Sequence, residues 1–64
     1  MFNGSKVREY RMAKDLSQRE LAGKIGRSEA YIQALEAGTK CETLNVAKLL
    51  CNTLDISVDD LYDE

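Results

Sequence analysis

The residue types that usually carry enzyme chemistry are scarce in this chain of 64 residues. It has no histidine, so neither imidazole metal ligation nor histidine general-base catalysis is available. Its two cysteines, Cys41 and Cys51, lack the short C-x2-C spacing of a metal site. No nucleophile–base pair or phosphate-binding glycine loop is present, and so short a chain has little room for a pocket. We therefore expect a binding protein, not an enzyme, with no metal, no cofactor and no small-molecule substrate.

The charges are distributed unevenly along the chain, although the formal net charge is only −2. Residues 1–40 contain eight Lys and Arg against five Asp and Glu, which gives a net charge of +3. Residues 41–64 contain one lysine against six Asp and Glu, which gives −5. A partner that contacts only the first part of the chain would therefore meet a basic surface.

The chain has no apolar run that resembles a signal peptide, and none that approaches the ~18 residues of a membrane span. We expect a single domain over residues 1–64, located in the cytoplasm, with no membrane contact. In that reducing compartment both cysteines would be free thiols, Cys41 exposed in a loop and Cys51 buried in a helix.

The apolar spacing predicts an all-α protein, a compact bundle of five short helices without strands. The expected helices cover residues 6–14, 17–26, 29–37, about 43–54 and 57–62, after a short arm at residues 1–4. Their predicted caps are Ser5, Ser17 with Glu20 as a capping box, Ser28, Thr43 and Ser57. Gly26 and Gly38 would end the second and third helices, and a loop would cover residues 39–42.

The apolar side chains expected to face the interior repeat at helical spacing. On the first three helices they are Val7, Tyr10, Met12, Leu21, Ala22, Ile25, Ile32 and Leu35. On the fourth helix the expected stripe is Leu44, Ala47, Leu50, Cys51 and Leu54.

Residues 17–38 form the most informative segment, with the sequence SQRELAGKIGRSEAYIQALEAG. It predicts two short helices joined by a turn that contains Gly26. Ala22 would be small because the second helix crosses closely over it. This arrangement is the helix-turn-helix pattern.

Residues 6–62 resemble the XRE-type helix-turn-helix domains of phage repressors, of the Cro and lambda-repressor type. The matching positions are Val7, Arg11, Leu16, Ser17, Gln18, Glu20, Leu21, Ala22, Ile25, Gly26, Ser28, Ile32, Leu35, Glu36, Gly38, Leu44, Leu50, Leu54, Ile56, Ser57, Val58, Asp59 and Leu61. The resemblance implies a DNA-binding transcriptional regulator, a repressor in a bacterium or phage. It would bind double-stranded DNA as a homodimer, with the third helix in the major groove.

The resemblance also implies which residues contact DNA. Gln18 would bond a phosphate and brace the start of the third helix, while Glu29, Ala30 and Ala34 would face the bases. The flanking positions that would reach phosphates or base edges are Arg27, Ser28, Tyr31, Gln33 and Lys40. A carboxylate only accepts hydrogen bonds and alanine offers only a methyl group, so direct base reading by this helix would be sparse.

Two further expectations follow from the same resemblance. Arg11 and Glu36 would form a buried, structural salt bridge. Val58, Leu61 and Tyr62 would form the dimer interface. Arg8, in contrast, is grouped with the ordinary solvated charges.

Two alternatives stay open at this point. Glu29 is equally explained as a favourable first-turn acid that interacts with the helix dipole. The whole domain could also be a protein-interaction module on the same scaffold, of the antitoxin or repressor-partner type. In that case its regulatory protein partner would replace DNA, and Glu29 and the two alanines would mark weakened DNA reading.

Overall fold

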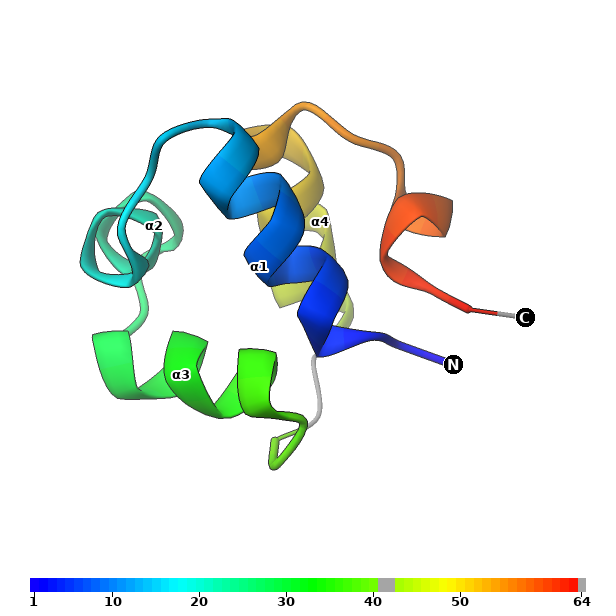
Figure 1. The fold of residues 1–64 in the computed structure, drawn as a ribbon, viewed down its shortest axis with the longest axis horizontal. Helices are drawn as coiled ribbons and strands as arrows, with labels where there is room; N and C mark the ends of the chain where they lie inside the picture. Colours follow the sequence, from blue (N-terminus) through cyan, green and yellow to red (C-terminus); the bar gives the residue numbers. More distant parts are fainter. Residues whose placement is uncertain (41–42, 64) are drawn as a thin grey trace.

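The computed structural model describes residues 1–40 and 43–63 and is all-helical, apart from one isolated β-bridge (Figure 1). Its elements are α1 (Gly4–Ala13), α2 (Gln18–Ile25), α3 (Glu29–Ala37), α4 (Leu44–Leu54) and η1 (Val58–Leu61). The predicted count of five α-helices is wrong, because the last segment is a single 3-10 turn of four residues. The predictions for Cys41 and Glu42 fall outside the described residues.

The 3-10 geometry of η1 follows from its short length. Asp60 N–H donates to the Ser57 carbonyl at 3.1 Å, and Tyr62 N–H donates to the Asp59 carbonyl at 3.2 Å. Both are i→i+3 bonds, which close a turn within so few residues. The Asp60 carboxylate also accepts from the Ser57 backbone N–H at 3.0 Å and from its hydroxyl at 3.2 Å. Asp60 therefore fastens the start of the turn.

Helix α1 begins two residues earlier than the sequence predicts. Its cap is Asn3, whose Oδ1 accepts from the Ser5 backbone N–H at 3.0 Å and from the Ser5 hydroxyl at 2.8 Å. Asn is as good a helix cap as Ser, and the Ser5 hydroxyl here donates to the cap instead of acting as one. The prediction of Ser5 as the cap is therefore wrong.

The first residues are not a free arm, because they pair with the end of the chain. Phe2 and Tyr62 form the antiparallel β-bridge, and their rings meet edge to face with centroids 5.6 Å apart. The Asn3 backbone N–H donates to the Leu61 carbonyl at 2.8 Å, and the Asn3 side-chain amide donates to the Asp63 carboxylate at 2.7 Å. The two chain ends consequently lie side by side in Figure 1.

Local signals set the bounds of α2 and α3 as predicted. Ser17 and Glu20 form the capping box, with Glu20 N–H donating to Ser17 Oγ at 3.0 Å and Ser17 N–H donating to Glu20 Oε1 at 2.9 Å. Hydrogen bonding to the Glu20 carboxylate from the Ser17 backbone N–H, and then from the Ser17 side chain, lowers the pKa of Glu20. Ser28 caps α3 through Tyr31 N–H at 3.2 Å. Gly26 and Gly38 follow the two helices with φ of 71° and 80°, which glycine adopts at little cost.

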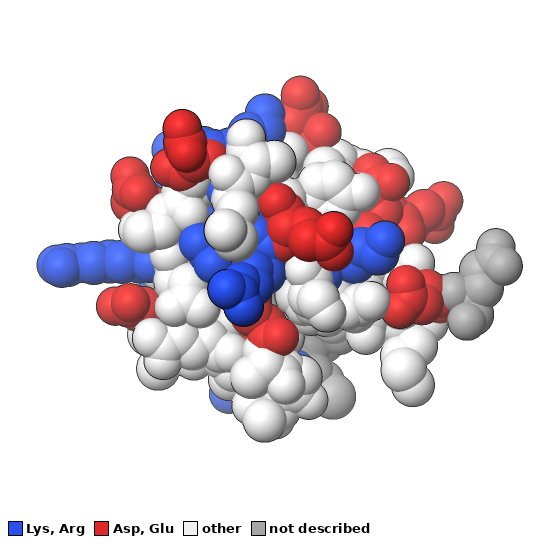
Figure 2. All heavy atoms as spheres, viewed as in Figure 1, with Lys and Arg blue, Asp and Glu red and all other residues white. Residues whose placement is uncertain are grey.

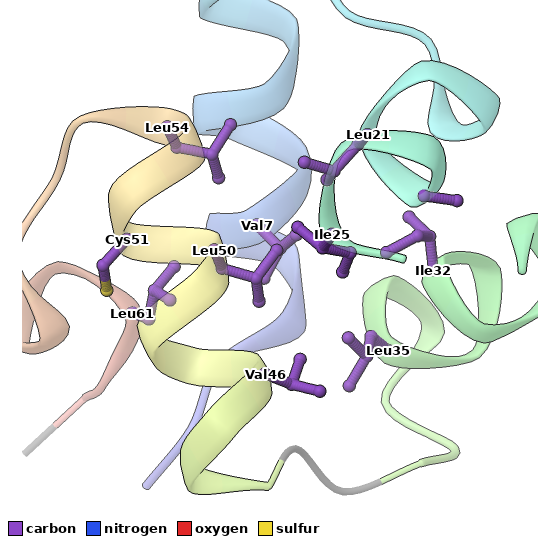
Figure 3. Packing of buried hydrophobic residues seen from close by; sticks show 11 residues of the cluster. Val7, Leu21, Ile25, Ile32, Leu35, Val46, Leu50, Cys51, Leu54 and Leu61 are labelled. Atoms are coloured by element: carbon purple, nitrogen blue, oxygen red, sulfur yellow. The ribbon is translucent and has the colours of Figure 1, made fainter. Parts of the chain in front are cut away.

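One hydrophobic core joins all five elements. Its buried members are Val7, Leu21, Ala22, Ile25, Ile32, Leu35, Val46, Ala47, Leu50, Cys51, Leu54 and Leu61. In Figure 3 most of these side chains point from the surrounding helices into the same interior. Burial, and then the nearby Asp60 carboxylate, raise the pKa of the Cys51 thiol, which therefore stays protonated as an inert core residue.

Three core predictions need correction. Met12 is 56% exposed and Leu44 is 70% exposed, so neither belongs to the core. Val46, which the prediction omitted, is fully buried. The buried stripe of α4 starts at Val46, whereas Leu44 begins the helix and lies before the contact with the core.

Membrane spans and metal sites are both absent from residues 1–40 and 43–63. No helix there is both long enough and apolar enough to span a membrane. The same residues contain no group of three or more Cys, Asp or Glu side chains placed to hold a metal ion.

Candidate nucleic-acid interface

Helices α2 and α3 form the predicted helix-turn-helix unit. They pack together through Leu21, Ala22 and Ile25 on one side and Ile32 and Leu35 on the other, all of them buried. Ala22, at 2% exposed, is among the buried residues of this unit. In Figure 1, α3 lies along one edge of the molecule, and no described helix covers its outer side. Helix α3 is therefore packed against the core on one side and left uncovered on the other.

The outer side of α3 carries short side chains along its centre. Ala30 and Ala37 are exposed and lie opposite the buried Ile32 and Leu35, and Ala34 beside them is half-buried. Methyl groups are therefore the only side chains along the centre of this face. Any longer side chain that α3 offers to a partner stands at the two margins of the face.

The first margin carries Glu29 and Gln33, both exposed. They line an open groove between α3, α1 and the beginning of α2. The full lining is Arg8, Arg11, Ser17, Gln18, Glu29, Gln33, Glu36 and Ala37. Arg8 is the charged residue of this set that was expected to be an ordinary solvated charge. Its spacing offered a signal, because Arg8 lies three residues before Arg11 and so shares a face of α1 with it.

A buried ionic network closes the floor of this groove. Arg11 Nε donates to Glu36 Oε2 at 2.7 Å and Arg11 Nη2 donates to Glu36 Oε1 at 3.2 Å. Arg11 Nη1 also donates to the Leu16 carbonyl at 2.7 Å. The expected ion pair between Arg11 and Glu36 is thus present, and it ties α1 to the last turn of α3.

The side chain of Gln18 joins this network. Gln18 Nε2 donates to Glu36 Oε1 at 3.0 Å, so Gln18 is held against the end of α3. The expectation that it braces the start of α3 is wrong, because the first turn of α2 lies beside the last turn of α3. The carboxylate accepts only one of the two N–H bonds of this amide, and the second remains for another acceptor.

The opposite margin of α3 carries two cations gathered around Tyr31. The guanidinium carbon of Arg27 lies 5.8 Å from the centre of the Tyr31 ring, and Lys40 Nζ lies 5.1 Å from it. Both distances are within the range of cation–π attraction. Tyr31 itself is half-buried against the core. Residues before and after α3 are therefore brought together at one place on its flank.

The remaining predicted contact, Ser28, has a structural role because its hydroxyl caps α3. The η1 surface differs from expectation. Leu61 is fully buried in its own core, so it is not available to a second chain, and its assignment to a dimer interface is wrong. Val58 is 42% exposed, and Tyr62 is half-buried against Phe2.

Charges of both signs are mixed on the face seen in Figure 2, where Lys and Arg side chains lie among Asp and Glu. Four aspartates, at positions 55, 59, 60 and 63, lie near the end of the chain and make that part acidic. An anionic partner would therefore depend on individual cations beside α3, since the molecule has no uniformly basic face here.

Comparison with known proteins agrees with this arrangement. The restriction-modification controller protein C.AhdI from Aeromonas hydrophila is 36% identical, with a TM-score of 0.86 over 92% of this chain and 89% of that chain. SinR of Bacillus subtilis, a master regulator for biofilm formation solved in complex with DNA, is 30% identical, with a TM-score of 0.87 over 94% and 97% of the two chains. A complex of SinR with SinI matches at 31% identity and a TM-score of 0.88, over 95% of this chain and 60% of that chain.

The search of curated protein sequences gives no match. The profile of the helix-turn-helix family matches residues 7–61, which is most of the chain. Such a unit requires two short helices, here α2 and α3, a glycine turn between them, and an uncovered outer side of the second helix. The chain therefore belongs to the XRE-type helix-turn-helix family of DNA-binding transcription regulators.

Proposed function

We propose that this protein is a sequence-specific DNA-binding regulator that acts as a repressor. It would bind as a homodimer, with α3 of each copy in the major groove. The observation that carries the proposal is the outer side of α3, which is uncovered, rigidly supported and flanked by residues that can bind DNA. The relatives support the proposal, since SinR is solved in complex with DNA.

The shape of α3 suits this role. A major groove about 12 Å wide admits an α-helix, and the alanines lower its profile so that the helix can lie deep in the groove. Ala30 and Ala34 would contact thymine methyl groups, and Gln33 would bond an adenine edge. Because these contacts are few, DNA shape would contribute part of the specificity.

Phosphate contacts would fix the position of the helix. On one side, the free N–H of the Gln18 amide and the backbone N–H groups that begin α2 would donate to a phosphate. On the other side, Arg27 and Lys40 would bind the opposite backbone. Neither set reads sequence, but together they would hold α3 in register.

A homodimer would place two copies of α3 in successive major grooves, about 34 Å apart. With Leu61 excluded, the η1 residues left for this contact are Val58 and the exposed part of Tyr62. A bound dimer would repress by covering its operator. The acidic residues of this end would stay away from the phosphates and so orient the protein on DNA.

The proposal is tested by fluorescence anisotropy with a pool of random duplexes at low and moderate salt, followed by sequencing of the bound fraction. We expect affinity that falls steeply with salt and a two-fold-symmetric enriched site. The spacing of its half-sites would then measure the geometry of the dimer. Absence of binding even at ~50 mM salt, where phosphate contacts are strongest, would contradict the proposal.

Replacing Glu29 with glutamine is expected to strengthen DNA binding and to change base preference. The carboxylate lies at the edge of α3, and removing one like charge near a phosphate is worth about 1 kcal/mol, or about fivefold in affinity. Glutamine can also form two bonds to adenine, so adenine should become enriched at one position of the selected site. Anisotropy and repeated selection measure both effects.

The matched control is Glu9→Gln, which makes the same change on an exposed position of α1. We expect Glu9→Gln to leave the selected sequence unchanged. If Glu29→Gln also leaves both affinity and sequence unchanged, Glu29 does not lie at the DNA.

The second candidate function is a protein-interaction module. The absence of long polar side chains along the centre of the outer face of α3 favours it, and one relative is solved as a protein complex. In that case DNA binding would be absent, and Glu29→Gln would alter binding to the protein partner instead. The anisotropy experiment therefore separates the two candidates.

A further inference from the structure

We infer that Arg8 of α1 binds a DNA phosphate on the margin of α3 opposite Arg27 and Lys40. This inference deepens the proposed function and rests on it. Helix α1, which lies outside the helix-turn-helix unit, would then contact the DNA directly.

Arg8 is the one arginine of the groove whose charge is available. It is exposed, and within the described part of the chain its side chain makes no hydrogen bond or ion pair. Arg11, in the same groove, is paired with the Glu36 carboxylate and uses three of its five N–H groups on Glu36 and the Leu16 carbonyl. An anion that enters this groove would therefore be attracted by Arg8.

Arg8 lines the same groove as groups to which the proposed function assigns DNA contacts. It shares the lining with Gln18, whose amide has a second N–H to donate, and with Gln33 on α3. It also shares it with Glu29, an exposed acid that would repel a phosphate. Arg8 would offset this repulsion, because a guanidinium can bind a phosphate through two parallel N–H bonds.

The angular positions of the α3 residues around the helix axis explain why a cation is needed on this side. With 100° per residue, Gln33 and Tyr31 lie about 160° apart around the helix axis. The groove with Arg8 and the cluster of Tyr31, Arg27 and Lys40 are therefore on opposite margins of the helix. A helix in the major groove lies between two phosphate backbones, so each margin of α3 would face one backbone. Because Arg11 is paired with Glu36, Arg8 supplies the unpaired cation of the first margin.

The test compares the salt dependence of DNA binding for the full chain and three variants, Arg8→Gln, Arg8→Lys and Lys48→Gln. Each phosphate contact contributes about 0.9 to the slope of log K against log salt. We expect Arg8→Gln to reduce the slope by about 0.9 on every duplex, without changing the selected sequence. Arg8→Lys should keep the slope of the unmodified protein. Lys48, an exposed cation on α4, is the matched control and should have no effect.

Two results would overturn the inference, and they are distinguishable. If the chain binds DNA but Arg8→Gln behaves like Lys48→Gln, Arg8 makes no phosphate contact, while the proposed function stands. If the unmodified chain binds no DNA at all, the proposed function and this inference fail together. Thermal unfolding of each variant serves as the folding check, and no change is expected because both residues are exposed.

Discussion

Replacing Glu36 with alanine is expected to reduce the free energy of unfolding by about 3–5 kcal/mol. Its carboxylate is the acceptor for Arg11 and for Gln18, and its side chain is only 5% exposed. Without it, the buried guanidinium of Arg11 keeps its charge but loses its partner. A small domain has only ~0.05–0.15 kcal/mol of stability per residue, so this loss would remove at least about a third of the total.

The measurement is thermal and urea unfolding followed by circular dichroism. Because 1 kcal/mol shifts Tm by about 4–8 °C in a domain of this size, we expect a fall of at least about 12 °C. Glu36→Gln, which keeps the shape of the side chain, provides a second variant if Glu36→Ala does not fold. The control Glu9→Ala removes an exposed acid from α1 and should stay within ~0.5 kcal/mol.

The double variant Arg11→Met with Glu36→Met distinguishes two sources of the lost stability, the loss of the ion pair itself and the burial of an unpaired charge. Replacing both partners by apolar residues of similar length should restore most of the stability, because the penalty comes from the unpaired ion. If Glu36→Ala unfolds at the same temperature as Glu9→Ala, the ion pair does not hold α3, and this part of the account is wrong.

Replacing Gly4 with alanine is the second large expected effect. A Cβ at this position would overlap the Leu35 carbonyl oxygen and would lie 3.2 Å from the Glu36 Cα. Both groups belong to the backbone of α3 and cannot rotate away, so α1 and α3 would have to separate. Such overpacking, including the backbone shifts that it forces, typically costs 1–3 kcal/mol and occasionally more, so we expect about 3 kcal/mol here.

Gly23→Ala is the matched control, because no atom lies within 4 Å of the Cβ that it would add. Gly23 lies inside α2, where alanine is favoured over glycine by about 1 kcal/mol. The same substitution should therefore raise Tm at position 23 and lower it at position 4. Equal effects of the two substitutions would show that α1 and α3 are not in the close contact described.

The bounds of α2 and α3 could be predicted because local chemistry sets them. Ser28 and Gly38 flank α3 directly, and the capping box of Ser17 and Glu20 begins α2. Each of these signals acts within four residues of the chain.

Features that depend on residues far apart in the chain could not be predicted from the sequence. Gly4 resembles part of a flexible arm until α3 is seen to pass against it. Leu61 resembles an interface residue because nothing local shows that the core reaches it. The partner of Gln18 depends on the relative placement of α2 and α3, and the availability of Arg8 depends on Arg11 being already engaged.

The central claim, that α3 is the DNA-contacting element, is tested most directly by NMR. Backbone amide shifts of the uniformly 15N-labelled chain would be recorded during titration with the selected duplex. We predict the largest changes at the exposed residues of α3, at the first turn of α2 and at Arg8, with small changes along the exposed face of α4. Shift changes confined to α4 and η1, with α3 unaffected, would contradict the account.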